Sequence, residues 1–136
     1  MVNEYLKVCS ESEAQVFDRW KMLEYNSGHL TEHVDMPADT ETHHQVAIQI
    51  LLPPKEICNY KGGILKVRVE KEIVDLYPCD EKWTHVIIPI GLPHEITPVE
   101  GTRISYIRQV FIKKDPSKEY PKQLDMPGIQ LMYALK

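Results

Sequence analysis

The sequence of 136 residues predicts a mainly β protein with one hydrophobic core, built as a sandwich or a barrel. Several short runs rich in Val, Ile, Tyr and Phe are separated by Gly, Pro and Asn turn signals at regular spacing. Helical patterns are confined to short segments near the two ends of the chain. With 43% hydrophobic and 26% charged residues, the composition is that of an ordinary folded domain.

The expected elements follow one another along the chain. A short helix is expected over 10–19, capped by Ser10 or Ser12 and with acidic residues in its first turn. The run that begins after Gly62-Gly63 is expected to bend or split near Lys71-Glu72, and the two glycines indicate a bulge or a close approach of backbones. In all, strands are expected over 20–25, 29–35, 45–52, 64–76, 83–90, 94–99 and 102–113.

A single domain is expected over residues 1–136, with a core that spans about 20–113. The extension 114–136 contains three of the chain's 10 prolines. It is expected either to end in a short helix over 128–136 that packs on the sheet, or to supply an oligomer contact.

Charge and cysteine usage exclude several classes of protein. The formal net charge of −4 gives no reason to expect nucleic-acid binding. The N-terminal sequence lacks the regions of a secretory signal, and no apolar run is long enough to span a membrane. Cys9, Cys58 and Cys79 are odd in number and lack a CxxC spacing, which favours reduced thiols. We therefore expect a cytoplasmic protein that binds neither nucleic acid nor membrane.

The most informative chemical pattern is a His-x-Asp pair followed by a distant histidine. In a strand, residues i and i+2 share a face, so His33 and Asp35 point the same way. His94 follows a Gly-Leu-Pro turn at the start of a strand. Two imidazoles and one carboxylate can occupy one face of an octahedral ferrous ion and leave the other face open for substrate and oxygen. Taken singly, each histidine is more often an ordinary surface or core residue. The other histidines are interpreted in that way: His29, His43, His44 and His85.

Arg103 and Ser105 share one face of the strand expected over 102–113. Burying a guanidinium is unfavourable unless an anion meets it, and arginine grips a carboxylate through two parallel hydrogen bonds. One interpretation is a clamp for the distal carboxylate of a small diacid, with the Ser105 hydroxyl assisting. The alternative is an arginine that reaches solvent from a strand edge or pairs with Glu100.

Three segments carry these patterns in one order: LEYNSGHLTEHVD (23–35), YKGGILKV (60–67) and PHEITPVEGTRISY (93–106). They hold the His-x-Asp pair, the Gly-Gly before a strand, the second histidine with the Pro-Val that follows it, and the arginine. Together they resemble the iron(II)- and 2-oxoglutarate-dependent oxygenases, especially the prolyl hydroxylase branch. The resemblance implies the double-stranded β-helix, or jelly roll, as the fold.

The resemblance also implies roles for individual residues. The metal-ligand roles, which are also the catalytic ones, fall on His33, Asp35 and His94. The co-substrate-binding roles fall on four residues: Arg103, Ser105, Tyr25 and Gln49, the last of which stands where some members have a tyrosine.

The implied activity is that of a dioxygenase, a hydroxylase that uses Fe(II), 2-oxoglutarate and O2, with ascorbate as an accessory reductant. It would release succinate and CO2. The first candidate substrate is a prolyl side chain of a protein or peptide, and a small molecule stays open. Position 35 holds a carboxylate rather than the small residue of the related halogenases, so hydroxylation is the expected reaction. Only 32 residues precede His33, which leaves little material for a substrate lid.

Two other classes of protein stay open at this stage. A cupin-like jelly-roll protein would bind metal through the same three side chains without turning over 2-oxoglutarate. A structural β-sandwich would bind no metal and would use the C-terminal tail for assembly.

Overall fold

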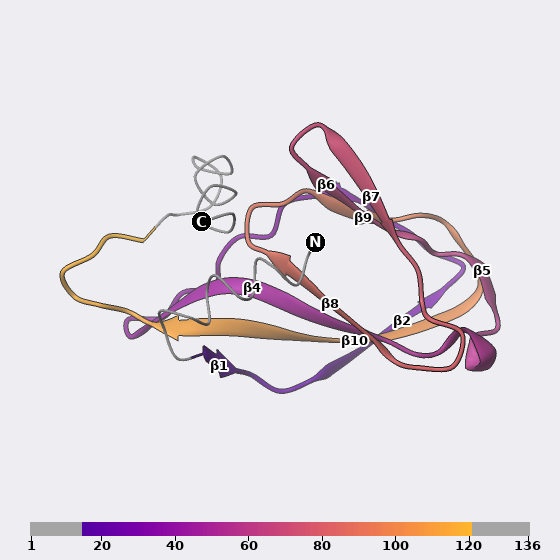
Figure 1. The fold of residues 1–136 in the computed structure, drawn as a ribbon, viewed down its shortest axis with the longest axis horizontal. Coiled ribbons are helices and arrows are strands. Elements are labelled where there is room, and N and C mark those ends of the chain that lie inside the picture. The colour runs from indigo at the N-terminus through magenta and orange to yellow at the C-terminus, as the bar shows by residue number, and fades with distance from the viewer. Residues whose placement is uncertain (1–14, 121–136) are drawn as a thin grey trace.

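The structure, a computed structural model, describes residues 15–120 of the chain and consists mainly of antiparallel β-strands. Two sheets face each other in a jelly-roll-like arrangement, one above the other in Figure 1. Within the described residues there is no α-helix, and the one helical element is the 3₁₀ turn η1 (Lys55–Ile57). No helix found there has the length and the apolar sequence needed to cross a membrane.

The larger sheet is organised around its longest strand. Its strands are β1 (Gln15–Phe17), β2 (Lys21–Asn26), β4 (His43–Leu52), β5 (Tyr60–Gly62), β8 (Thr84–Pro89) and β10 (Val99–Lys113). The strand order is β1-β10-β4-β8, and β2 and β5 also pair with β10. Strand β10 therefore pairs with four of the other five strands, and only β8 reaches the sheet through β4.

The smaller sheet has the order β3-β9-β6-β7. Its strands are β3 (Leu30–His33), β6 (Leu65–Val69), β7 (Glu72–Leu76) and β9 (His94–Ile96). Strands β6 and β7 form a hairpin that turns at Glu70, whose φ is 59°. The expected run over 64–76 is thus split near Lys71-Glu72, as the sequence predicted.

The main core lies between the sheets. Because side chains alternate across a strand, Ile48 and Ile50 of β4 share the inner face with Val86 and Ile88 of β8, their partners in the register. They pack in one buried cluster with residues of the smaller sheet such as Leu65. A second cluster covers the outer face of the larger sheet, where it includes Val46, Ala47, Ile87, Val110 and Ile112.

The sequence predicted the jelly-roll fold correctly, but the helix expected over 10–19 is wrong for its described part. Residues Gln15–Phe17 form strand β1, which pairs with Val110–Ile112 of β10. The capping and acidic signals are local preferences, and an open edge of β10 offers this segment a full set of backbone hydrogen bonds. The helix expected over 128–136 lies outside the described residues.

The main core between the sheets should contribute much of the free energy of unfolding. Ile88 is 1% exposed in this cluster, whereas Ile73 on β7 is 52% exposed. Ile88→Ala should lower the free energy of unfolding by about 2–5 kcal/mol, because it removes buried methyl groups and leaves a cavity. The matched control Ile73→Ala should change it by about 0.5 kcal/mol or less. Urea unfolding measures both, and equal losses would contradict this placement of the core.

Candidate metal centre and anion site

The pairing of β3 with β9 brings the two predicted histidine ligands together. His33 and His94 are direct partners across the two strands, and their ring centroids lie 4.4 Å apart. The carboxylate of Asp35 lies between them, 3.3 Å from His33 Nε2 and 3.2 Å from His94 Nε2. One donor atom from each of the three residues lies within 4.8 Å of the others. Over residues 15–120, this is the one cluster of its kind.

Backbone carbonyls orient both imidazoles. His33 Nδ1 is 2.8 Å from the carbonyl oxygen of Thr31, and His94 Nδ1 is 3.0 Å from that of Leu92. A carbonyl oxygen can only accept a hydrogen bond, so each Nδ1 carries a proton, and in the neutral form of each ring Nε2 has the lone pair that a metal ion needs. Metal-ligating histidines are usually held in this way, by a hydrogen bond from the ring nitrogen that does not bind the metal.

The close contact between His94 and Asp35 shifts the pKa of each group. A hydrogen bond from His94 lowers the pKa of Asp35; burial opposes this change, while the charges of His94 and His33 support it. Burial alone would lower the pKa of His94, but hydrogen bonds with Asp35 and the Leu92 carbonyl outweigh it and raise the pKa above 6.5. A proton therefore competes for His94 Nε2, and metal binding should strengthen as the pH rises.

The three side chains suit a divalent metal ion with open coordination positions. The His94 side chain is 6% exposed, whereas those of His33 and Asp35 are 33% and 35% exposed. The cluster is therefore anchored in the fold on one side and accessible on the other. Two imidazoles and a carboxylate are the donors of the facial triad that binds Fe(II) in non-haem oxygenases, so the residues present fit that ion.

Arg103 extends from β10 into the space between the sheets, and it is 1% exposed. Its Nε donates to the carbonyl oxygen of Gly63 at 2.9 Å, and one terminal nitrogen donates to Ser105 Oγ at 3.3 Å. No carboxylate of the described residues forms an ion pair with Arg103. The alternative of a solvent-exposed arginine is therefore wrong. The alternative of a pair with Glu100 is also wrong, because Glu100 is exposed and forms no ion pair with Arg103.

The surroundings of Arg103 are neutral. Burial lowers the pKa of the guanidinium, and nearby Tyr60, Tyr25 and Cys58 oppose that shift. Arginine nevertheless stays charged in proteins. Arg103 is thus a buried cation with several hydrogen-bond donors and only neutral partners among residues 15–120, which is the arrangement expected of an anion site.

The Gly62-Gly63 pair allows this packing. Both residues have positive φ angles, 69° and 62°, which favour glycine. A Cβ at Gly63 would lie 2.8 Å from Arg103 Cδ and 3.2 Å from Tyr60 Cε2. A Cβ at Gly62 would overlap the carbonyl oxygen of Pro98. The close backbone approach predicted from the sequence is therefore present, and at Gly63 it makes room for the arginine.

Two tyrosines flank the guanidinium, and the sequence pointed to one of them. Tyr25 of β2 is the direct partner of Arg103 in the register, so both side chains lie on the same face. Tyr60 of β5 also packs beside the Arg103 side chain, over Gly63, although the sequence analysis gave it no role. The signal available in the sequence was its position just before Gly62-Gly63, but the pairing of β5 with β10 is needed to interpret it.

Gln49 does not join this site. It pairs with Arg108 in the register, and Arg108 lies on the opposite face of β10 from Arg103 and Ser105. Its side chain interacts with His85 Nδ1 at 3.1 Å and accepts a hydrogen bond from Arg108 Nε at 2.7 Å. The expected contact between Gln49 and a co-substrate is not supported by this position, because the sheet separates the two groups.

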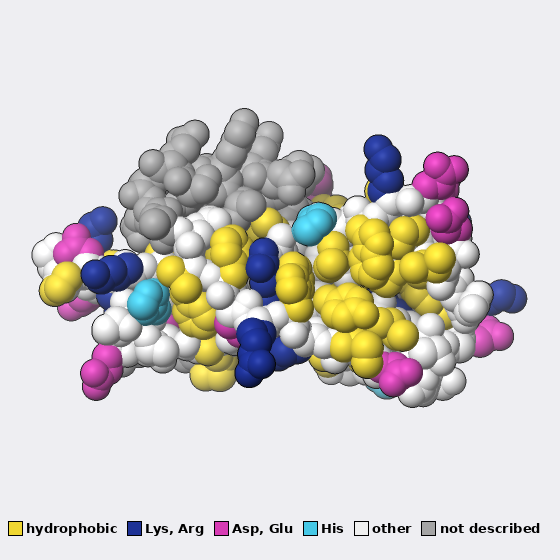
Figure 2. Space-filling view, turned by 90° about the horizontal axis from the view of Figure 1, so that it is seen from below, with side chains coloured by type: hydrophobic (Ala, Val, Ile, Leu, Met, Phe, Trp, Pro, Cys, Tyr) yellow, Lys and Arg dark blue, Asp and Glu magenta, His cyan; other side chains and the backbone are white. Residues whose placement is uncertain are grey.

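The outer face of the larger sheet is rich in exposed hydrophobic side chains (Figure 2). The guanidinium of Arg108 lies over the rings of Phe17 and Trp20, at 4.1 and 4.4 Å from their centroids. Trp83 packs near Tyr106 on this face, with ring centroids 6.0 Å apart. Arg108 is therefore held by aromatic rings and an amide, in contrast to Arg103.

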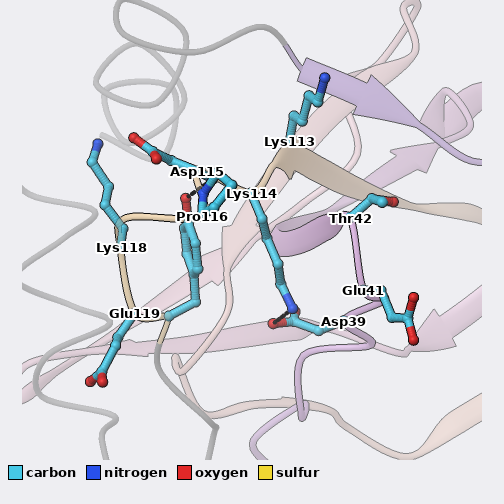
Figure 3. A pocket seen from close by; sticks show the side chains of 10 residues that line it. Asp39, Glu41, Thr42, Lys113, Lys114, Asp115, Pro116, Lys118 and Glu119 are labelled. Carbon is cyan, nitrogen blue, oxygen red and sulfur yellow. Dashed lines mark hydrogen bonds and ion pairs between the residues drawn. The ribbon is translucent and has the colours of Figure 1, made fainter.

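A cavity of about 930 Å³ lies at the end of β10 (Figure 3). Lys114 Nζ donates to the Thr40 carbonyl oxygen at 2.7 Å and pairs with Asp39 at 3.6 Å. His44 also interacts with Asp39, at 2.9 Å. Because three lysines and four carboxylates line this cavity, it has no excess of positive charge, and it contains none of the three candidate metal ligands.

Comparisons with known proteins support the fold. No family model and no curated protein matches the sequence. Among solved structures, the chain is similar to a prolyl-4-hydroxylase of Pseudomonas putida, with a TM-score of 0.51 and 17% sequence identity. The match covers 73% of this chain and 52% of that one, so this chain spans about half the length of the solved structure. At this identity, the similarity shows the jelly-roll-like fold.

If the three side chains bind one ion together, removing any of them should weaken metal binding. His33→Ala and Asp35→Ala should each reduce the affinity for Mn(II), measured by calorimetry, by at least about 100-fold, the upper end of what outer-shell partners contribute. The matched control is His85→Ala, because His85 is exposed on the outer face of the larger sheet. If that control lost as much affinity as the other two, or if none lost any, the ligand set would be wrong.

Proposed function

We propose that the protein is a dioxygenase dependent on Fe(II) and 2-oxoglutarate, one that hydroxylates a substrate C–H bond with release of succinate and CO2. The observation that carries this proposal is the combination of a partly exposed two-histidine, one-carboxylate cluster with a buried arginine that has no acidic partner among residues 15–120. The first feature suits Fe(II), and the second suits a dicarboxylate.

The metal-binding side chains would hold the ion through His33 Nε2, His94 Nε2 and the carboxylate of Asp35. Their Nδ1 hydrogen bonds to backbone carbonyls fix both rings before any ion binds. When bound, iron supplies the redox chemistry together with O2 and 2-oxoglutarate. The protein's own contribution is to orient the ligands and to leave one side of the cluster open.

The anion site would hold the distal carboxylate of the co-substrate. The Nε of Arg103 is already committed to Gly63, so the terminal nitrogens remain to face a carboxylate in the fork geometry that arginine favours. Ser105, also 1% exposed, keeps one of these nitrogens in place and offers a hydroxyl. Tyr25 adds a phenol from the neighbouring strand.

A prolyl side chain of a protein or peptide is the first candidate for the substrate. Support comes from the similarity in fold to a prolyl-4-hydroxylase and from the YKGGILKV and PHEITPVEGTRISY segments. A small-molecule substrate is the alternative. Candidate peptides and small molecules can be ranked by how much each increases succinate formation in the presence of Fe(II) and 2-oxoglutarate.

The role of Arg103 can be tested without knowing the substrate. In Mn(II)-loaded protein, Arg103→Met should reduce the affinity for 2-oxoglutarate by about 30-fold or more, because it removes the charged partner of a buried carboxylate. Affinity for Mn(II) should be unchanged. Arg108→Met is the matched control, since Arg108 lies on the same strand with its side chain on the other face. Isothermal calorimetry measures both affinities.

Two outcomes would count against the proposed function. If the metal-loaded wild-type protein bound no 2-oxoglutarate, the chain would be a cupin-like metal-binding protein instead. If it bound no metal, a structural β-sandwich would be the better description.

A further inference from the structure

Tyr60 is a partly buried residue beside Arg103 that has no role in the proposed function. It begins β5, which pairs with the start of β10 through Val99–Gly101. Its ring packs against the main core cluster and, with Arg103, fills the space above Gly63. Tyr60 therefore reaches the guanidinium from a different strand and a different side than Tyr25 and Ser105 do.

The side chains of Tyr60 and Arg103 meet over Gly63, where a Cβ would lie 3.2 Å from both Tyr60 Cε2 and Arg103 Nε. A guanidinium can only donate hydrogen bonds, so a phenol oxygen that faces it can accept while its own O–H proton stays free to donate. The thiol of Cys58 is the other neighbour of the phenol, and Cys58 already faces the carbonyl oxygens of Pro53 and Pro54 at 3.6 and 3.1 Å. A carboxylate beside Arg103 would be a much stronger acceptor for the Tyr60 proton than a thiol.

The stretch of β4 around Gln49 offers no competing polar side chain on the inner face. Gln49 points to the outer face, while the neighbouring inward residues Ile48 and Ile50 are hydrocarbon and belong to the main core. A diacid that reached Arg103 would therefore meet an apolar wall on the β4 side. The donors available to it come from β10, β2 and β5.

Tyr60 also separates Arg103 from a second opening. A cavity of about 420 Å³ is lined by Tyr60 and Gly63 together with Lys55, Cys58, Tyr77 and Asp80, and Arg103 is not in its lining. Arg103 packs against Tyr60 and Gly63 but does not line this cavity, so these two residues form part of the wall between the cavity and the guanidinium. A guanidinium that is 1% exposed makes stronger hydrogen bonds to a charged group than one in water.

Resting on the proposed function, we infer that Tyr60 is a co-substrate-binding residue, which donates its phenol proton to the distal carboxylate held by Arg103 and Ser105. In this chain it supplies the polar contact expected from Gln49. Gly63 is then required because any side chain there would displace both Arg103 and Tyr60.

The test compares two ligands of the Mn(II)-loaded protein by calorimetry. One is 2-oxoglutarate, and the other is 2-oxobutyrate, which has the same 2-oxo acid end but no distal carboxylate. Tyr60→Phe keeps the ring and removes only the hydroxyl. It should weaken 2-oxoglutarate binding by about tenfold or more, the usual effect of losing one hydrogen bond to a charged group. Its affinities for 2-oxobutyrate and for Mn(II) should equal those of the wild type.

Tyr77→Phe is the matched control, because Tyr77 lines the same cavity but is 58% exposed; it should leave both affinities unchanged. If Tyr60→Phe bound 2-oxoglutarate as tightly as the wild type, or lost affinity for both ligands equally, the role given to Tyr60 would be wrong while the proposed function stood. If the wild-type protein itself bound no 2-oxoglutarate, the proposed function would fail, and the role of Tyr60 with it.

Discussion

Arg103 carries a full positive charge into the space between the two sheets, where its exposed fraction is 1%. Its hydrogen bonds to Gly63 and Ser105 satisfy some of its donors, but they do not neutralise the charge. A buried cation of this kind destabilises the fold unless an anion binds to it. Several local features are consistent with binding of an anion at Arg103. They are the Gly62-Gly63 pair, Ser105 two positions along β10, Tyr25 of β2 and Tyr60 of β5.

The candidate metal centre depends on strand pairing in the smaller sheet. Antiparallel pairing of β3 with β9 sets His33 opposite His94, and the chain leaving β3 returns Asp35 between them. Because two backbone carbonyls already hold the rings, little reorganisation is needed for an ion to bind. The smaller sheet thus positions the three candidate metal ligands and the larger sheet carries Arg103, with the main core between the two sheets.

Most of this arrangement could be predicted from the sequence, because its signals are local or strongly patterned. The alternation of β-branched residues predicted the strands, and the His-x-Asp spacing predicted a shared face. Three features depended on pairings between distant segments. Residues 15–17 form a strand and not the predicted helix because they pair with the edge of β10. The face of Gln49 follows from its register with Arg108, and Tyr60 meets Arg103 only because β5 pairs with β10.

The most direct measurement is a crystal structure of the full chain grown without oxygen, in the presence of Mn(II) and 2-oxoglutarate. We expect one ion bound by His33 Nε2, Asp35 and His94 Nε2, and one diacid that reaches from that ion to the guanidinium of Arg103. An ion bound elsewhere, or a diacid whose distal carboxylate lies away from Arg103, would contradict the central claim that the two sheets form a single site.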